Sequence, residues 1–154
     1  MTSISPVTVT ATTSRHFAAV RARLPVADVS RRFREFLDQV YALARQGGMK
    51  LDGQNIFLYR ATESPDIVDA EFGVGVTEPF TPSGNVVRAV IPAREVATAT
   101  LMGDYSGIRG AHQAVIDWCK ANGRQRTGTR WEIYGHWTAD PSQLRTDVFH
   151  ELTG

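Results

Sequence analysis

A single carboxylate, Glu132, lies inside a run of large aromatic and branched residues, GTRWEIYGHW at 128–137. Such a composition is typical of a buried strand, where a charged side chain is costly unless its charge is compensated. A carboxylate among aromatic rings can be the countercharge of a bound cation, which the ring faces also attract. On a solvated sheet face the same glutamate would be an ordinary surface charge, so the placing of the strand decides between the two interpretations.

The two faces of this strand carry different chemistry, because side chains alternate along a strand. When the helix stops and turns of the two halves of the chain are aligned, WEIY at 131–134 matches IFLY at 56–59. We expect one face to be apolar and to lie beneath the helices, with Trp131, Ile133, Ile56 and Leu58. The other face is predicted to carry the candidate ligand-binding residues, which are Glu132, Tyr134, Phe57, Tyr59 and, near the strand end, His136.

The elements that must position these residues occur twice in the sequence. Each half has an alternating strand, an amphipathic helix and two further strands. In the first half we expect strands at 17–24, 54–60 and 68–76, with a helix that ends before Gly47. In the second half we expect strands at 94–102, 130–137 and 145–152, with a helix that ends before Asn122. The segment EPFTPSGN at 78–85 suits a linker between the halves.

This duplicated βαββ unit predicts an α+β fold. The two units are expected to form one antiparallel sheet, with two helices on one face and a ligand cleft on the other. A chain of 154 residues fits a single domain, here 1–154, with pseudo-repeats at about 15–77 and 86–152. The opening residues are expected to form a frayed tail or, through Val7 and Val9, a short edge strand.

The composition argues against several classes of function. Seventeen basic and sixteen acidic residues leave a formal charge of +1, so no strong field attracts nucleic acid or an anionic membrane. We find no secretory signal and no apolar run long enough to cross a membrane. The lone Cys119 excludes an internal disulfide and indicates a reducing compartment. We therefore expect a cytoplasmic protein, monomer or homodimer, that binds neither nucleic acid nor membranes.

Other groups of residues do not predict a site. Gly103, Gly107 and Gly110 follow a strand and open a helix, but their spacing fits neither the dinucleotide nor the phosphate-loop motif. Asp69 and Glu71 alternate onto one strand face, where they can add charge to the rim of a cleft. No histidine stands at metal-ligand spacing to another or to the cysteine, so we expect neither a metal nor a cofactor. The histidines are His16, His112, His136 and His150.

The repeat, the turns and the WEIY strand make the chain similar to the GyrI-like family. That family includes effector-binding domains attached to AraC-type and MerR-type transcription regulators, and also stand-alone versions. The segments that carry the resemblance are IPAREVATATLMGDYSGI at 91–108, QAVIDWCKANG at 113–123, WEIYGHWTADP at 131–141 and RTDVFHEL at 145–152. The resemblance implies the duplicated βαββ fold and the binding of small, often cationic and hydrophobic compounds in a cleft between the halves.

The resemblance also implies roles for single residues. Glu132 occupies the place of a strand glutamate that acts as countercharge, Tyr134 belongs to the same motif, and Tyr105 matches an aromatic position near the cleft. Some stand-alone members of the family are hydrolases that open strained cyclopropane compounds with cleft carboxylates and tyrosines. The chain has no recognisable helix-turn-helix segment, so we expect the effector module to work alone.

Three hypotheses of function follow. The first is a stand-alone protein that binds hydrophobic, cationic compounds between aromatic rings, with Glu132 as the countercharge. The second is a hydrolase, in which Glu132 orients or deprotonates a water and Tyr134 or Tyr105 donates a proton to the leaving oxygen. The third is an interaction module of the gyrase-inhibitor type that docks on another protein through an acidic rim.

Overall fold

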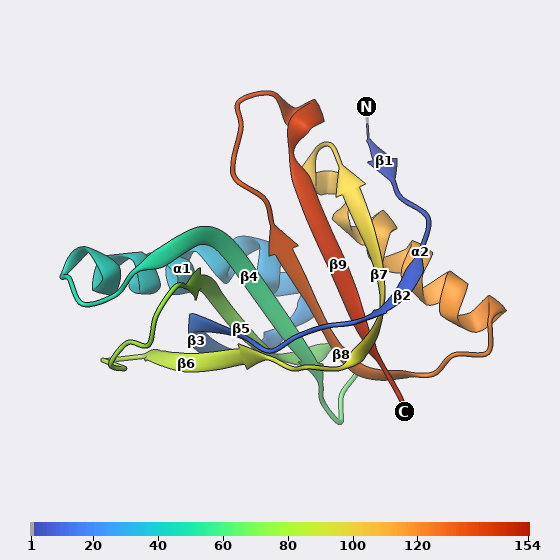
Figure 1. The fold of residues 1–154 in the computed structure, drawn as a ribbon. Coiled ribbons are helices and arrows are strands. Elements are labelled where there is room, and N and C mark those ends of the chain that lie inside the picture. Colours follow the sequence, from blue (N-terminus) through green and yellow to red (C-terminus); the bar gives the residue numbers. More distant parts are fainter. Residues whose placement is uncertain (1) are drawn as a thin grey trace. The chain divides into compact units, whose positions relative to one another are not determined.

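The computed structural model describes residues 2–154, which form two compact units. The first unit runs from Ser14 to Pro92, and the second combines the segment up to Thr13 with Ala93–Gly154. The described residues contain nine strands and two α-helices (Figure 1), and their strand pairs are antiparallel. The predicted α+β class and the strand, helix, strand, strand order of each half are confirmed.

The first unit is a four-stranded sheet covered by one helix (Figure 1). Its strands are β3 (Arg15–Pro25), β4 (Leu51–Ala61), β5 (Ile67–Val76) and β6 (Val86–Ile91), in the spatial order β4, β5, β3, β6. After the 3-10 turn η1 (Val26–Asp28), α1 (Val29–Arg45) packs on β3 and β5. Its apolar stripe faces the sheet, and Phe36 stacks on Phe72 with ring centroids 5.3 Å apart.

The second unit repeats this arrangement. Its strands are β1 (Ser3–Ile4), β2 (Thr8–Ala11), β7 (Glu95–Met102), β8 (Arg126–Tyr134) and β9 (Arg145–Leu152). β9 pairs with β7 and β8, while β1 and β2 pair with the free edge of β7. The 3-10 turn η2 (Tyr105–Gly107) leads into α2 (Ile108–Ala121), and η3 (Pro141–Gln143) precedes β9. The helix buries an apolar stripe on the sheet, with Ala111, Val115 and Cys119 in the shared core.

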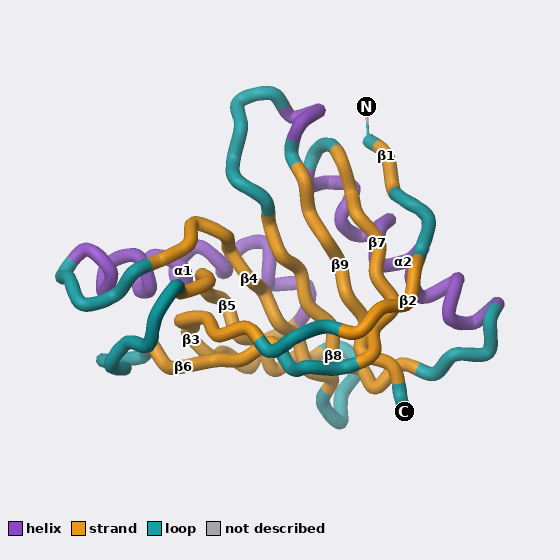
Figure 2. The backbone as a smooth tube through the Cα atoms, in the orientation of Figure 1, coloured by secondary structure: helices purple, strands orange, loops and turns teal. Residues whose placement is uncertain are grey.

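The structure decides one alternative and differs from the predicted strands in two larger ways. Of a frayed tail or an edge strand near the start, it shows the edge strand: β2 pairs with β7 and includes Val9, and Val7 lies just before it. β6 was not predicted from the sequence, and it pairs with β3 in the first unit. The strand expected at 130–137 is wrong at its end: β8 stops at Tyr134, and the chain continues as a loop through His136 (Figure 2).

The prediction of which strand face lies under the second helix is wrong. Glu132 is the cross-strand partner of Val148, and Val148 belongs to the core beneath α2. Because side chains alternate along β8, Glu132 and Tyr134 face α2, whereas Trp131 and Ile133 face the other side of the sheet. The more apolar face of β8 is therefore the one that points away from the helix.

The first unit shows the same reversal. Phe57 packs against Phe33 of α1, with ring centroids 5.4 Å apart, and Tyr59 packs on Phe72 from the same side. Ile56 and Leu58 therefore lie on the face away from the helix, where both are 0% exposed. Since both faces of these strands are buried, apolar composition alone could not identify the helix side.

Candidate functional site

A chain of three polar side chains joins α2 to β8 and β9 within the second unit. Nε2 of His112 lies 2.7 Å from Oε2 of Glu132, and Nδ1 of His112 lies 2.8 Å from Nε2 of His150. The helix contributes the middle member and each strand contributes one end. We call Glu132, His112 and His150 the triad.

Two tyrosines adjoin the carboxylate end of the triad. The Tyr134 hydroxyl donates to Oε1 of Glu132 at 2.7 Å, so each carboxylate oxygen accepts from a side chain of this unit. The ring of Tyr105, from η2, meets the ring of Tyr134 edge to face with centroids 5.5 Å apart. The structure thus brings together Glu132, Tyr134 and Tyr105, which the sequence predicted as site residues.

The triad is almost wholly withdrawn from solvent. The side chains of Glu132 and His112 are 8% and 16% exposed, and His150 is 1% exposed. Burial, together with the charges of His112 and two arginines, lowers the pKa of His150 from 6.5 to about 3. His150 is therefore a neutral ring at physiological pH. Burial also raises the pKa of Tyr105, which keeps its hydroxyl protonated.

A buried hydroxyl lies beside this group. Thr146 is the cross-strand partner of Tyr134 and is 0% exposed. Its Oγ1 has no hydrogen-bond partner among residues 2–154. An unpaired buried hydroxyl costs free energy. Thr146 is therefore a polar group that an incoming ligand or water could satisfy.

The other predicted site residues are not part of this cluster. Phe57 and Tyr59 belong to the first unit, where their rings pack on Phe72. His136 is exposed in the loop that follows β8. Their role as ligand contacts stays a prediction.

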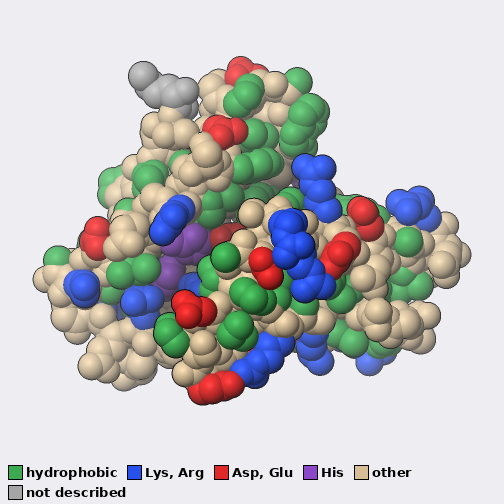
Figure 3. All heavy atoms as spheres, turned by 180° about the vertical axis from the view of Figure 1, so that it is seen from behind, with side chains coloured by type: hydrophobic (Ala, Val, Ile, Leu, Met, Phe, Trp, Pro, Cys, Tyr) green, Lys and Arg blue, Asp and Glu red, His purple; other side chains and the backbone are tan. Residues whose placement is uncertain are grey.

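Sequence reasoning missed both histidines of the triad. His112 stands one helical turn after Ile108 and one residue after Ala111, so it lies on the buried stripe of α2. His150 alternates with Val148 and Leu152 on the buried face of β9. Periodicity therefore marked both as interior residues, and an interior histidine needs a polar partner. Histidine side chains also reach the surface on the face drawn in Figure 3.

The geometry of the triad is not that of a metal site. His112 uses both ring nitrogens for its two neighbours, so the three side chains form a line rather than converge on one point. No group of three or more histidine, cysteine or acidic side chains within residues 2–154 could hold a metal ion. In the same part of the chain, no helix is long and apolar enough to span a membrane.

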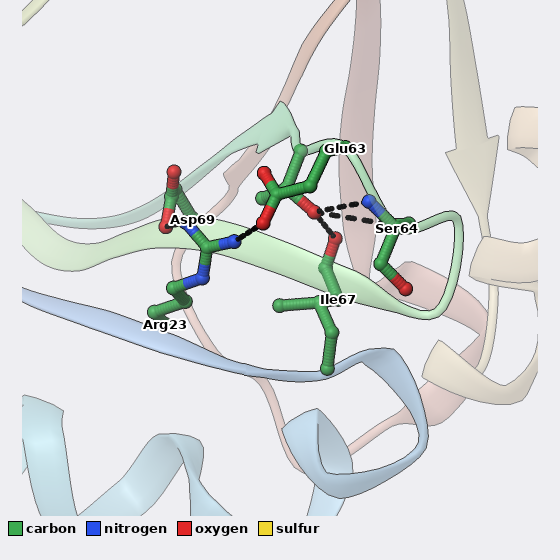
Figure 4. A network of polar contacts seen from close by, with 6 residues as sticks. Arg23, Glu63, Ser64, Ile67 and Asp69 are labelled. Atoms are coloured by element: carbon green, nitrogen blue, oxygen red, sulfur yellow. Dashed lines mark hydrogen bonds and ion pairs between the residues drawn. The ribbon is translucent and has the colours of Figure 1, made fainter.

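The first unit also holds a buried carboxylate, Glu71. This side chain is 4% exposed and is bonded to Arg21 at 2.9 Å and Arg60 at 2.7 Å. With Arg23 and Asp69 these residues line a shallow surface pocket of about 390 Å³. Figure 4 shows Arg23 turned toward Asp69 and bonded to Glu63. Each acid here is matched by a neighbouring guanidinium, as expected of an ion-pair network that holds strand ends together.

The two units differ at one equivalent helix–strand contact. The fifth residue of α1 is Phe33 and the fifth of α2 is His112. Phe33 packs on Phe57, and His112 bonds to Glu132, the residue that aligns with Phe57 when IFLY is matched to WEIY. The same fold therefore uses an aromatic pair in one unit and a hydrogen-bonded histidine–glutamate pair in the other.

A family model described as a GyrI-like small molecule binding domain matches residues 6–152. Among solved structures, the C-terminal domain of EcmrR is 22% identical, with a TM-score of 0.80 and 96% of each chain covered. A second structure, of EcmrR bound to DNA, is 20% identical with a TM-score of 0.79. It covers 97% of this chain, which spans only 57% of that EcmrR chain.

Two more distant structures share the fold. SAV2435, solved with tetraphenylphosphonium bound, is 9% identical with a TM-score of 0.68, and the match covers 96% of this chain and 94% of that one. A hydrolase from Listeria innocua is 11% identical with a TM-score of 0.63, covering 96% and 91%. None of the curated proteins compared with the sequence matches it. At these identities the structural likeness concerns the fold alone.

Proposed function

The chain belongs to the GyrI-like family of small-molecule binding domains, and on that basis we propose that it binds hydrophobic, cationic compounds with Glu132 as the countercharge. Tyr134 and Tyr105 would supply ring surface beside the carboxylate. SAV2435, which shares the fold, was solved with tetraphenylphosphonium, a bulky cation without hydrogen-bond donors. A ligand of this kind is recognised by charge and apolar area rather than by directed hydrogen bonds.

The proposal rests on the histidine–glutamate pair that stands where the first unit has an aromatic pair. The first unit shows that this fold can fill the helix–strand contact with Phe33 and Phe57, so packing does not require a buried glutamate at the equivalent place. Withdrawing a carboxylate from water costs free energy that burying two rings does not. Its presence at this contact therefore supports a role that the aromatic pair cannot perform. A carboxylate offers about four acceptor positions, so Glu132 can hold His112 and Tyr134 and still compensate a cation.

The test compares a cationic and a neutral ligand of similar shape. Tetraphenylphosphonium and triphenylphosphine oxide would be titrated into the protein and into Glu132→Gln by calorimetry. Glutamine keeps the size of the side chain and one acceptor oxygen but removes the charge. We expect the variant to bind the cation at least about tenfold more weakly, or 1.4 kcal/mol, and to bind the neutral compound within about threefold of the parent.

Glu151→Gln is the matched control. Glu151 lies on β9, on the face away from α2, and it contacts Arg94 at 3.8 Å. Its loss should leave the affinity for both compounds unchanged. If Glu132→Gln lowered the affinity for both ligands equally, the glutamate would act through packing. If it weakened neither, the countercharge assignment would be wrong.

The hydrogen bond between Tyr134 and Glu132 favours a second candidate, a hydrolase. A carboxylate and a phenol in contact at 2.7 Å are suited to general base and general acid roles on one substrate. In such a reaction Glu132 would deprotonate or orient a water, and Tyr134 or Tyr105 would protonate the leaving oxygen of an opened strained ring.

Turnover distinguishes the two functions. A cyclopropane electrophile would be incubated with the protein and with Tyr134→Phe, and its ring-opened product followed by chromatography. The hydrolase requires product formation that falls by about 10²-fold or more in the variant, while tetraphenylphosphonium binding persists. Binding of the electrophile without product would leave the protein a binder.

A further inference from the structure

The proposed function gives a role to Glu132 but none to the two histidines behind it. His112 bridges Glu132 and His150 with contacts of 2.7 and 2.8 Å. The rings of the two histidines lie 5.0 Å apart at 73°. A hydrogen-bonded line from a carboxylate through two imidazoles can hold different numbers of protons without a change of shape.

The short contacts determine where the protons can lie. Each contact needs one hydrogen between a donor and an acceptor. An ionised carboxylate can only accept, so Nε2 of His112 donates to Glu132. In the contact between the two histidines, either ring can be the hydrogen-bond donor.

The two donor–acceptor arrangements of this contact differ by one proton. If His150 donates from Nε2, His112 is neutral and the triad carries one negative charge. If His112 donates from Nδ1, it is an imidazolium, His150 accepts with Nε2 and keeps its own proton on Nδ1, and the triad has no net charge. The net charge is also zero when the added proton lies on Glu132. Both short contacts survive in each form.

His150 serves as the partner that accepts or donates without becoming charged. Burial first, and the neighbouring positive charges next, hold its pKa near 3. An added proton would lie at the contact between His112 and Glu132, whose atoms are 2.7 Å apart. His150 responds only by moving its single proton from one ring nitrogen to the other.

The other groups around the triad are arginines, hydroxyl groups and one carboxylate that is paired with an arginine. α2 packs on β7, β9 and η2. β7 offers alanine and leucine side chains to this core and, at its first residue, Glu95, which is paired with Arg124. Arg126 and Arg130 of β8 lie close enough to His150 to lower its pKa, and arginines remain charged at all relevant pH values. The remaining polar or charged groups are Thr146 of β9, Tyr134 of β8, Tyr105 of η2 and Arg109, one turn earlier on α2.

We propose that the triad exchanges one proton for one cationic ligand. The ligand binds beside Glu132, and the proton held between His112 and Glu132 leaves to the solvent, so the total charge of the site is conserved. An imidazolium 2.7 Å from the carboxylate and a bound cation share one negative charge and repel each other. His112 is thus a specificity-determining residue, because with its added proton the site favours neutral ligands and without it the site favours cations.

This inference rests on the proposed function for its ligand, and calorimetry with tetraphenylphosphonium tests the exchange. Titrations in two buffers of different protonation enthalpy, at each pH from roughly 5 to 8, give the number of protons released per ligand. We expect the release of one proton per ligand wherever the triad holds its added proton before binding, and no release where it does not. The affinity should rise by up to about tenfold per pH unit wherever the release is one.

Two variants locate the proton. His112→Gln keeps an amide that donates to Glu132 but has no exchangeable charge, so it should bind tetraphenylphosphonium without proton release and with little dependence on pH. His16→Gln, at an exposed position of β3, is the matched control and should release protons as the parent does. Binding by the parent without release, or an unchanged release from His112→Gln, overturns the exchange but not the countercharge role of Glu132.

A measurement without ligand separates this inference from the proposed function. Nitrogen NMR of protein labelled in histidine reports which ring nitrogen of His150 carries the proton. We expect Nε2 at high pH and Nδ1 once the triad has taken up its proton. A His150 that keeps one tautomer throughout overturns the inference, whether or not tetraphenylphosphonium binds.

Discussion

His150 should make the folded protein sensitive to acid. Its ring is 1% exposed, and its pKa falls from 6.5 to about 3 on folding. Between these two values the unfolded chain binds a proton at this residue and the folded protein does not. Stability therefore rises with pH in this window, is fully present above 6.5 and is progressively lost as the pH falls toward 3.

The size of the effect follows from the two pKa values. Each pH unit inside the window is worth about 1.4 kcal/mol, so lowering the pH from 7 to 5 should cost about 2 kcal/mol of unfolding free energy through His150 alone. That is a substantial share of the roughly 5 to 15 kcal/mol by which a folded domain is stable. It should move the urea midpoint by about 1 M for a slope of about 2 kcal/mol per M.

Urea denaturation of the parent and of His150→Gln at both pH values measures this cost. Glutamine cannot titrate but can still bond to His112, and its packing defect is the same at both pH values, so it cancels in the difference. The variant should lose about 2 kcal/mol less than the parent on acidification. His16→Gln, which changes an exposed histidine, should lose as much as the parent. Equal losses in the parent and His150→Gln would refute the reasoning.

Two further predictions concern packing. Gly73→Ala should destabilise the protein by about 3 kcal/mol or more, because the added Cβ would stand 2.0 Å from the backbone oxygen of Ala18. The control Gly110→Ala adds a Cβ no closer than 3.6 Å to its neighbour in a helix, and should stabilise by about 0.5 to 1 kcal/mol. Urea denaturation measures both, and effects of the same sign would contradict the steric argument. The double variant His112→Phe with Glu132→Phe copies the first unit, and should match or exceed the parent in stability by up to about 4 kcal/mol while losing tetraphenylphosphonium binding. A stable double variant that still bound the cation would count against the proposed site.

The sequence was sufficient for most of the elements, though not for β6, and it did not show which strand face meets each helix. Local periodicity and turn chemistry identified β9 at its observed bounds and both helices, because these signals depend on neighbours along the chain. Alternation correctly separated Glu132 from Trp131, but it is symmetric under exchange of the two faces. The deciding fact was a contact between α2 and β8, His112 with Glu132. A contact between residues twenty positions apart leaves no mark in a local pattern.

The orientation of β8, with Glu132 on the face toward α2, changes the environment of this carboxylate. On an open sheet face, Glu132 would have exchanged water for a ligand at little cost. Beneath α2 it is 8% exposed and held by His112 and Tyr134, so the carboxyl group belongs to the protein interior. An interior carboxylate is stabilised by a positive charge close by, and His112 can supply one by taking up a proton. A ligand that brings its own charge takes over that role, which is why cation binding and proton release should occur together.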